Sequence, residues 1–343
     1  MNTSEINTKY YIGIDGGGTK TKFLAARLIE GISADGTESS GLEIIGEYTG
    51  GGCHYMQIGF DGLEELIRKG ITSVCESAGI EPSDVDFTFI GFAGCGDVVS
   101  DQPMLNEALA KAFGDMPYAA GNDSENALEG ALAGAPGINI IAGTGSIGSG
   151  RNAAGEFRRC GGWHYYLGGD EGSAYWLAWN LLKEYSRQAD GRSPKTLVYD
   201  AVNRALDLHT DDEMVTRVVN EWNLDRTHIA GLAPIVSQLY NDGDPYAKAL
   251  LSDCAHELAL MAIALYDQLG FADAASDSAA ASGSTDADAL VPVSGTGGVF
   301  KSGPAITEPF ARILREHGMQ YVKPDTTPDM GALMLAVKYG QNI

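Results

Sequence analysis

Residues 10–25 read YYIGIDGGGTKTKFLA, in which three consecutive glycines follow an aspartate. Backbone N–H groups approach an anion closely only where side chains are absent, so the stretch predicts a phosphate-binding turn. The residues before Asp15 alternate loosely, as in a strand, and the residues after the glycines carry no helix-capping signal. We therefore expect a strand–turn–strand hairpin with residues 16–18 at its tip.

Two other phosphate motifs fit this stretch less well. Residues 13–19 nearly match the P-loop pattern GxxxxGK[ST], but Gly18 is followed by Thr19 and then by Lys20. A dinucleotide-binding GxGxxG would lack its third glycine, and both motifs open a helix where a strand is expected here. A tight hairpin turn without a ligand is the remaining alternative, because a glycine triplet alone is weak evidence.

Composition excludes several classes of protein. The chain has 343 residues, of which 44% are hydrophobic, and a net charge of −23. A surface this acidic repels phosphate backbones, so we expect no nucleic-acid partner. The amino-terminal stretch MNTSEINTKYY has no apolar signal core, and we expect no membrane-spanning segment. These features predict a cytoplasmic protein.

Cysteine and histidine spacing gives no sign of a structural metal. The five cysteines include no CxxC pair, and the six histidines show no metal-ligand spacing. We expect small buried thiols rather than a disulfide framework, and no protein-bound transition metal.

The rest of the chain alternates between strand and helix patterns. INIIAGTGSIGSGRN (138–152) predicts a second strand–turn–strand, and LVPVSGTGGVFKSG (290–303) predicts a strand, a glycine-rich turn and a helix start. A buried strand is expected at 86–94 and a mobile acidic surface loop at 272–289. Helices are expected at 63–78, at 104–113, from near Gly172, after the capping-box pattern at 210–213, at 245–269 and from Pro328. This order predicts an α/β protein with two similar halves and a ligand held between them.

These stretches together resemble a known superfamily. The glycine stretch resembles the first phosphate motif of the sugar kinase, actin and heat-shock ATPase superfamily, in which a hairpin turn touches the ATP phosphates. IIAGTGSIG (140–148) is similar to the second phosphate motif, VPVSGTGGVFKSG (291–303) to the adenosine motif, and DMGALMLAV (329–337) to the connecting helix. GNDSENALEGAL, CGGW and GGDEGSAYW are most similar to the N-acetylglucosamine kinases and the BadF/BadG-type ATPases.

The resemblance covers nearly the whole chain and implies its architecture. It implies an α/β fold of two ribonuclease H-like (actin-like ATPase) domains with a cleft between them. We place the first domain at 1–118 and the second at 119–325. Residues 326–343 would form a helix that packs back on the first domain.

The resemblance also implies ATP and Mg²⁺ as cofactors. Asp15 would hold Mg²⁺ through water, because this ion keeps much of its hydration. For Lys20 and Lys301, solvated side chains are the alternative. Contacts to the nucleotide would come from Gly17, Gly18, Thr19, Lys20, Thr144, Gly145, Gly295, Gly297, Gly298 and Lys301.

Asp123 is the candidate catalytic base. A helix N-terminus favours an ionised carboxylate, which accepts the proton of a sugar hydroxyl. A simple helix cap is the alternative for Asp123 and for Asp170, and a core tryptophan is the alternative for Trp163. Sugar contacts would come from His54, Asp123, Ser146, Ile147, Trp163 and Asp170.

The implied activity is that of an ATP-dependent hexosamine kinase acting on O6 of N-acetylglucosamine. The alternatives are a glucosamine or N-acetylmuramic acid kinase, an ATPase activator of a radical dehydratase with an iron–sulfur cluster, and a sensor without turnover. Family members often form homodimers. The chain departs from the family at His54, where asparagine is usual and a cation would form at roughly pH 6–7. A second departure is His164, where glycine is usual.

Overall fold

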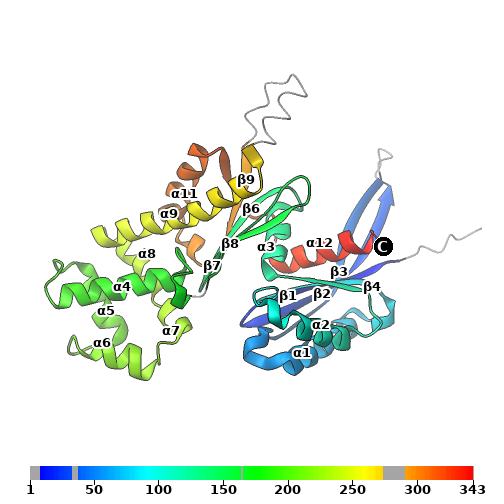
Figure 1. Ribbon diagram of the computed structural model, residues 1–343, viewed down its shortest axis with the longest axis horizontal. Coiled ribbons are helices and arrows are strands. Elements are labelled where there is room, and N and C mark those ends of the chain that lie inside the picture. Colours follow the sequence, from blue (N-terminus) through cyan, green and yellow to red (C-terminus); the bar gives the residue numbers. More distant parts are fainter. Residues whose placement is uncertain (1–7, 33–37, 164, 273–289, 343) are drawn as a thin grey trace, which may run out of the picture. The chain divides into compact units, whose positions relative to one another are not determined.

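The computed structural model describes residues 8–32, 38–163, 165–272 and 290–342. The chain forms two compact units (Figure 1). Unit 1 comprises Met1–Ala135 and Asp325–Ile343, and unit 2 comprises Pro136–Pro324. The acidic segment at 273–289 and His164 lie outside the described residues.

Unit 1 contains one five-stranded sheet. Its elements are β1 (Tyr10–Gly16), β2 (Lys20–Ile32), β3 (Glu38–Gly51), α1 (Tyr55–Ala78), η1 (Pro82–Asp84), β4 (Val85–Phe92), η2 (Val99–Asp101), α2 (Gln102–Phe113), β5 (Tyr118–Gly121), α3 (Asp123–Leu132) and α12 (Pro328–Gly340). The strand order is β3-β2-β1-β4-β5, with β1, β2 and β3 antiparallel and β1, β4 and β5 parallel. The carboxyl ends of the three parallel strands therefore lie at the same end of the sheet, which is where ligands bind in open α/β sheets.

Two apolar cores cover the two faces of this sheet. Ile12, Ile14 and Phe23 belong to the core formed with α1 and α2. Tyr11 and Ala26 belong to the core formed with α12. Neighbouring residues of β1 thus point to opposite layers, as the period of a strand requires.

The carboxyl-terminal helix α12, red in Figure 1, is an integral part of unit 1. Gly13 lets α12 approach β1, because a Cβ there would lie 2.3 Å from the Leu333 nitrogen. Gly331 lets α12 approach α3, because a Cβ there would lie 2.0 Å from the Asn126 carbonyl oxygen. Both glycines are needed for backbone packing rather than for an unusual φ.

The boundary between the units differs from the expected one at 118. β5 pairs with β4, and α3 packs on α12, so residues 119–135 group with unit 1. The second boundary, after Pro324, lies within one residue of the expected position.

Unit 2 repeats the strand pattern of unit 1. Its elements are β6 (Gly137–Ala142), β7 (Ser146–Arg151), β8 (Phe157–Gly161), η3 (Tyr165–Leu167), α4 (Ala174–Ala189), α5 (Leu197–Leu206), α6 (Glu213–Val215), η4 (Thr216–Glu221), α7 (Arg226–Ala230), α8 (Ala233–Asn241), α9 (Pro245–Gln268), β9 (Val291–Thr296), η5 (Val299–Ser302), α11 (Pro304–Glu316) and β10 (Met319–Val322). The strand order is β10-β9-β6-β7-β8, again with an antiparallel hairpin on one side of the central strand and parallel strands on the other. The expectation of two similar halves is confirmed.

Helix α9 is long and apolar enough to cross a membrane by length and composition alone. Its apolar residues instead build the core of unit 2, where Leu251, Cys254 and Leu258 are fully buried. The composition of α9 is therefore that of a core helix, which packs on β6, β7 and β8.

Two expected helices differ from the observed ones. α1 begins at Tyr55 rather than at 63, with an interruption at Gly59, where φ is 74°. The helix expected after 213 is a single turn, α6, followed by the π-helix η4. Helical periodicity does not distinguish a π-helix from an α-helix over so short a segment.

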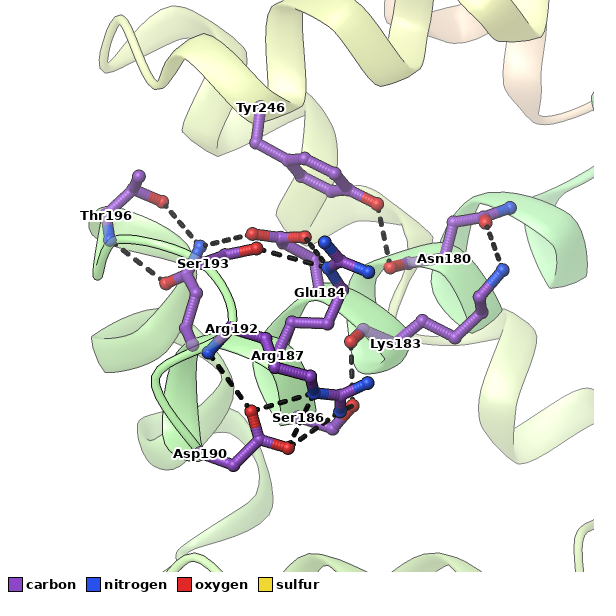
Figure 2. A network of polar contacts seen from close by, with 11 residues as sticks. Asn180, Lys183, Glu184, Ser186, Arg187, Asp190, Arg192, Ser193, Thr196 and Tyr246 are labelled. Atoms are coloured by element: carbon purple, nitrogen blue, oxygen red, sulfur yellow. Dashed lines mark hydrogen bonds and ion pairs between the residues drawn. The ribbon is translucent and has the colours of Figure 1, made fainter.

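A buried amide fixes the loop between α4 and α5. The Gln188 side chain donates to Glu184 Oε1 and Thr196 Oγ1, each at 3.1 Å, and is fully buried. Gln188 Oε1 accepts from the Thr196 N–H at 3.0 Å. Figure 2 shows the outer part of this network, in which Arg187 contacts Glu184 and Ser193.

Candidate active site

The first phosphate turn joins β1 to β2, as expected. The Gly17 N–H donates to the Lys20 carbonyl at 3.0 Å and closes the turn. Gly16 serves packing, because a Cβ there would lie 2.4 Å from Cys53 Sγ. A Cβ at Gly18 would meet no atom within 4 Å, and its φ is not positive. Since the chain itself does not require glycine at 18, the bare exposed amide suits an external anion.

Asp15 lies near the end of β1, directly before this turn. Asn126 Nδ2 of α3 donates to Asp15 Oδ1 at 2.9 Å and to the Gly91 carbonyl at 3.0 Å. Burial raises the pKa of Asp15 to about 6, with a further rise from the Asp329 charge, while the Asn126 hydrogen bond and Lys22 oppose it. Asp15 offers carboxylate oxygens, which are the ligands that Mg²⁺ prefers, and a cation beside it would favour its charged form. Within the described part of the chain, no group of three or more His, Cys, Asp or Glu side chains could hold a metal, so Asp15 alone suits an ion that keeps most of its waters.

Two lysines of β2 have different surroundings. Lys22 Nζ lies 3.0 Å from Asp329 Oδ2 and ties β2 to α12. Lys20 is exposed, and its charge opposes the burial that raises the pKa of Asp15. Lys20 and the exposed Thr19 remain predicted phosphate contacts, whereas Lys22 has a structural role.

Asp123 is the first residue of α3, and the helix cap is its neighbour Asn122. Asn122 Oδ1 accepts from the Ser124 N–H at 3.1 Å, and Glu125 Oε1 accepts from the Asn122 N–H at 3.0 Å. This capping box removes the alternative that Asp123 is present as the cap. Asp123 is half-buried in the first helical turn, where the aligned N–H groups favour an ionised carboxylate.

The carboxylates of Asp123 and Asp15 both lie close enough to the Cys53 thiol to affect its pKa. Burial raises the pKa of Cys53 to about 12, and the charges of Asp123 and Asp15 add to the rise. The Cys53 N–H donates to the Gly17 carbonyl at 3.1 Å. The structure thus brings Asp15, Gly17 and Asp123 to one edge of the unit-1 sheet.

His54 directly follows Cys53 and precedes α1 without capping it through its side chain. His54 Nδ1 is buried and finds no hydrogen-bond partner among the described residues. Burial lowers the pKa of His54, and Asp97 opposes this shift. Desolvation thus favours the neutral ring and opposes the cation that was expected at roughly pH 6–7.

The second phosphate turn, between β6 and β7, is held by the start of α4. The Ala174 N–H donates to the Gly143 carbonyl at 2.9 Å, and the Tyr175 N–H donates to the Thr144 carbonyl at 3.2 Å. Two of the unpaired N–H groups at the helix start are satisfied in this way. Thr144 itself is exposed at the tip of the turn.

Asp170 lies beside this turn in an unusual conformation. Its φ is +67°, and only 6% of the residue is exposed. Asp170 Oδ1 accepts from the Ser146 N–H at 3.0 Å, and Oδ2 forms an ion pair with Arg226. A Cβ at Gly145 would lie 2.4 Å from Asp170 Oδ1. Thr144, Gly145, Ser146 and Asp170 thus form one cluster within unit 2.

A family model for the BadF/BadG/BcrA/BcrD ATPases matches residues 12–336. The chain belongs to the BadF/BadG/BcrA/BcrD ATPase family.

Two relatives and one solved structure show which members of the family this chain is similar to. It is 30% identical over 268 residues to an N-acetylmuramic acid/N-acetylglucosamine kinase of Clostridium acetobutylicum, covering 76% of this chain and 80% of the relative. It is 25% identical over 343 residues to an N-acetyl-D-glucosamine kinase of Dictyostelium discoideum, covering 97% and 99%. A structure of a candidate N-acetylglucosamine kinase from Chromobacterium violaceum superposes with a TM-score of 0.69 at 25% identity, covering 96% and 99%. The two-domain sugar kinase and actin-like ATPase fold expected from the sequence is confirmed.

The glycines of the stretch that resembles an adenosine motif, residues 291–303, have different structural roles. Gly297 has φ +100°, a conformation that favours glycine. A Cβ at Gly295 would lie 2.4 Å from the Phe300 ring, so the chain itself fills the space that we expected adenine or ribose to use. Gly298 and Lys301 line a cavity of about 450 Å³, together with Ala174 and other residues of unit 2. This volume is in the range of small-molecule sites.

Two predicted sugar contacts lie at the margin of the Asp170 cluster. Ile147 is half-buried on β7 and would lie 2.8 Å from a Cβ at Gly162. Trp163 is 71% exposed, which excludes the alternative of a core tryptophan. Both remain predicted sugar contacts.

Sequence reasoning missed Asn126 and Arg226. Asn126 lies within the quoted stretch GNDSENALEG, three residues after Asp123, but no spacing rule links it to the end of β1. Arg226 follows Asp170 by 56 residues and begins a short helix, α7, that periodicity did not predict. The Asp225 cap of that helix, which accepts from the His228 N–H, was the available signal.

Proposed function

We propose that this protein transfers the γ-phosphate of ATP to O6 of N-acetylglucosamine. The chain is an ATP-dependent amino sugar kinase of the BadF/BadG/BcrA/BcrD family, in keeping with its kinase relatives. The observation that carries the sugar assignment is the buried carboxylate of Asp170, held 3.0 Å from the Ser146 N–H beside the second phosphate turn. A carboxylate accepts hydrogen bonds from neighbouring hydroxyl groups, which are the groups that a sugar offers.

Asp123 serves as the base in this proposal. It accepts the proton of the sugar hydroxyl while that oxygen attacks the γ-phosphorus and the bond to the bridging oxygen of ADP breaks. The helix start of α3 favours the ionised carboxylate that this step needs. Asn122 carries the capping role, so capping does not account for the carboxylate at 123.

Asp15 organises the metal. Asp15 would hold Mg²⁺ through water, and Asn126 keeps the carboxylate in place. The bound ion would supply positive charge that offsets the charge developing on the phosphate oxygens. The exposed Gly18 amide and the Thr19 hydroxyl contact the phosphates, and Gly17, whose own N–H closes the turn, lets them approach its bare backbone.

Unit 2 supplies further nucleotide and sugar contacts. The cavity lined by Gly298 and Lys301 takes the adenosine, and the Thr144–Gly145 turn contacts phosphate oxygens. Ser146, Ile147 and Trp163 contact the sugar beside Asp170. His54, in unit 1, presents a neutral imidazole to the 2-substituent of the sugar.

Glucosamine and N-acetylmuramic acid are the alternative substrates. The relative from Clostridium acetobutylicum is named for both N-acetylmuramic acid and N-acetylglucosamine. The alternative of a radical dehydratase activator is less favoured, since the relatives described above are amino sugar kinases over most of this chain. We propose that the kinase works in the cytoplasm, without nucleic acid or membrane partners, as a monomer or homodimer.

A coupled ADP-release assay tests this function. The purified protein is given ATP, Mg²⁺ and, in turn, N-acetylglucosamine, glucosamine, N-acetylmuramic acid and glucose. We expect the highest kcat/KM with N-acetylglucosamine. A strong preference for glucose would contradict the proposal, and ADP release that is independent of any sugar would favour an ATPase.

A further inference from the structure

Arg226 is the residue of unit 2 that contacts Asp170 from a distant part of the sequence. Its Nη2 forms an ion pair with Asp170 Oδ2, and the Asp170 carboxylate is almost completely buried. We propose that Arg226 is a positioning residue that holds the Asp170 carboxylate in the orientation in which it binds the sugar hydroxyls. This inference rests on the sugar-binding role proposed for Asp170.

The Asp170 carboxylate is fixed from two directions. The Ser146 N–H donates to Oδ1 at 3.0 Å, and the Arg226 guanidinium contacts Oδ2. The second phosphate turn packs against both groups, because a Cβ at Gly145 would lie 2.1 Å from Arg226 Nη2 and 2.4 Å from Asp170 Oδ1. A change in the arginine therefore acts on the carboxylate directly.

The Arg226 guanidinium is itself held by its surroundings. It lies 5.2 Å from the centre of the Tyr165 ring, over the face that attracts cations. Its Nε is buried and has no hydrogen-bond partner among the described residues. A buried donor without a partner lowers stability, so its presence beside Asp170 calls for a reason other than stability.

An unusual backbone segment delivers Arg226 to this position. The π-helix η4 is followed by Asn223 and Leu224, both with positive φ, of 49° and 55°. Leucine rarely adopts this conformation, and such strained positions cluster at functional sites. Asp225 then caps α7, and Arg226 is the first residue of that helix. A π-helix within a helical segment is likewise frequent at functional sites.

A phosphate-binding role is the competing explanation for Arg226, since its guanidinium touches Gly145 of the second phosphate turn. The two roles predict different kinetics. A residue that orients Asp170 affects the KM for the sugar, whereas a residue that binds the γ-phosphate affects kcat or the KM for ATP.

The test compares Arg226→Met with Arg217→Met, in steady-state assays that vary the sugar and ATP separately. Arg217 is a matched control, because its side chain is also 35% exposed but contacts Glu221 and the Leu206 carbonyl instead of Asp170. Loss of a charge-assisted contact should raise the KM for N-acetylglucosamine by roughly 10–100-fold in Arg226→Met and leave the KM for ATP within about twofold. Arg217→Met should match the wild type.

Two further variants complete the experiment. Arg226→Lys keeps the charge but loses the planar fork, so its sugar KM should lie between those of the wild type and Arg226→Met, and this variant serves if the methionine variant does not fold. If Arg226 acts through Asp170, Asp170→Asn with Arg226→Met should have nearly the sugar KM of Asp170→Asn alone.

Three results would overturn the inference. The first is a wild-type sugar KM in whichever Arg226 variant folds. The second is a fall in kcat, or a rise in the KM for ATP, at unchanged sugar KM. The third is a double variant in which the effects of Asp170→Asn and Arg226→Met on the sugar KM multiply fully. If the wild type phosphorylates no amino sugar at all, the proposed function itself fails, which this design separates from failure of the Arg226 role.

Discussion

The Asn126 side chain donates to the Asp15 carboxylate at 2.9 Å and so joins the start of α3 to the end of β1. The same amide group donates to the Gly91 carbonyl of β4 at 3.0 Å. One side chain therefore fixes the acid that is proposed to hold Mg²⁺ relative to two strands and to the helix that carries Asp123.

Replacing Asn126 by alanine should weaken both the fold and metal use. The buried acceptors lose their donor, which should lower the free energy of unfolding by about 1–3 kcal/mol. The Mg²⁺ concentration for half-maximal activity should rise severalfold, because Asp15 is no longer held in place. Urea unfolding and Mg²⁺ titration of activity measure the two effects. Asn106→Ala, at an exposed position of α2, is the control, and identical behaviour of the two variants would contradict the role of Asn126.

Replacing Asp123 by asparagine should remove the proposed base and leave the fold intact. Asn122 and Glu125 retain the capping box, so the melting temperature should change little. The kcat should fall by roughly 10²–10⁴-fold, with nucleotide binding preserved. Steady-state kinetics and calorimetric titration with ADP provide the readouts. Asp115→Asn, at an exposed site of the same unit, should behave as wild type; wild-type turnover in Asp123→Asn would assign that residue no chemical role.

The lowered pKa of His54 has a defined effect on stability. At pH values above the ordinary value of 6.5, the ring is neutral in both the folded and the unfolded chain. Below that value the unfolded chain takes up the proton more readily, so folding loses stability as the pH falls. Urea unfolding at pH 7.5, 6.5 and 5.5 should therefore show a steeper decline for the wild type than for His54→Asn. Parallel declines would show that burial does not shift the titration of His54.

The same variant tests the place of His54 in sugar selection. His54→Asn should change the ratio of kcat/KM among the three amino sugars more than it changes the KM for ATP. An unchanged ratio would remove His54 from the sugar site.

The Gln188 network predicts a purely structural effect. Gln188→Ala leaves the buried Glu184 carboxylate and the Thr196 N–H without their shared partner, which should lower the free energy of unfolding by about 1–3 kcal/mol. The KM values for sugar and ATP should stay unchanged. Lys183→Ala, at an exposed position of the same helix (Figure 2), should shift stability by less than about 0.5 kcal/mol. Equal melting temperatures for the two variants would contradict the account of this network.

Much of the fold could be predicted because its signals are local. The turn at residues 16–18, the strand at 86–94 and the long helix after Asp244 each depend on neighbouring residues, and each is observed. The boundary at 118 was misplaced because β5 has four residues and owes its place to parallel pairing with β4, which local sequence does not encode.

The candidate site residues could be proposed one by one from the sequence, but their contacts could not. Motifs pointed to Asp15, Asp123 and Asp170, whereas no motif pointed to Asn126 and Arg226, which contact Asp15 and Asp170. A hydrogen bond between residues 111 positions apart, as between Asn126 and Asp15, depends on how the strands and helices pack. For Gly295, the sequence suggested open space for adenine or ribose. The folded structure instead places the Phe300 ring beside this glycine, a contact that the local sequence does not reveal.

The central claim is that the protein phosphorylates an amino sugar at O6, and product analysis by ¹³C and ³¹P nuclear magnetic resonance tests it most directly. After incubation with N-acetylglucosamine, ATP and Mg²⁺, we predict one phosphate monoester coupled to C6 of the sugar, formed in equal amount to ADP. Phosphate attached at another carbon, or ADP formed together with free phosphate and unchanged sugar, would contradict the account.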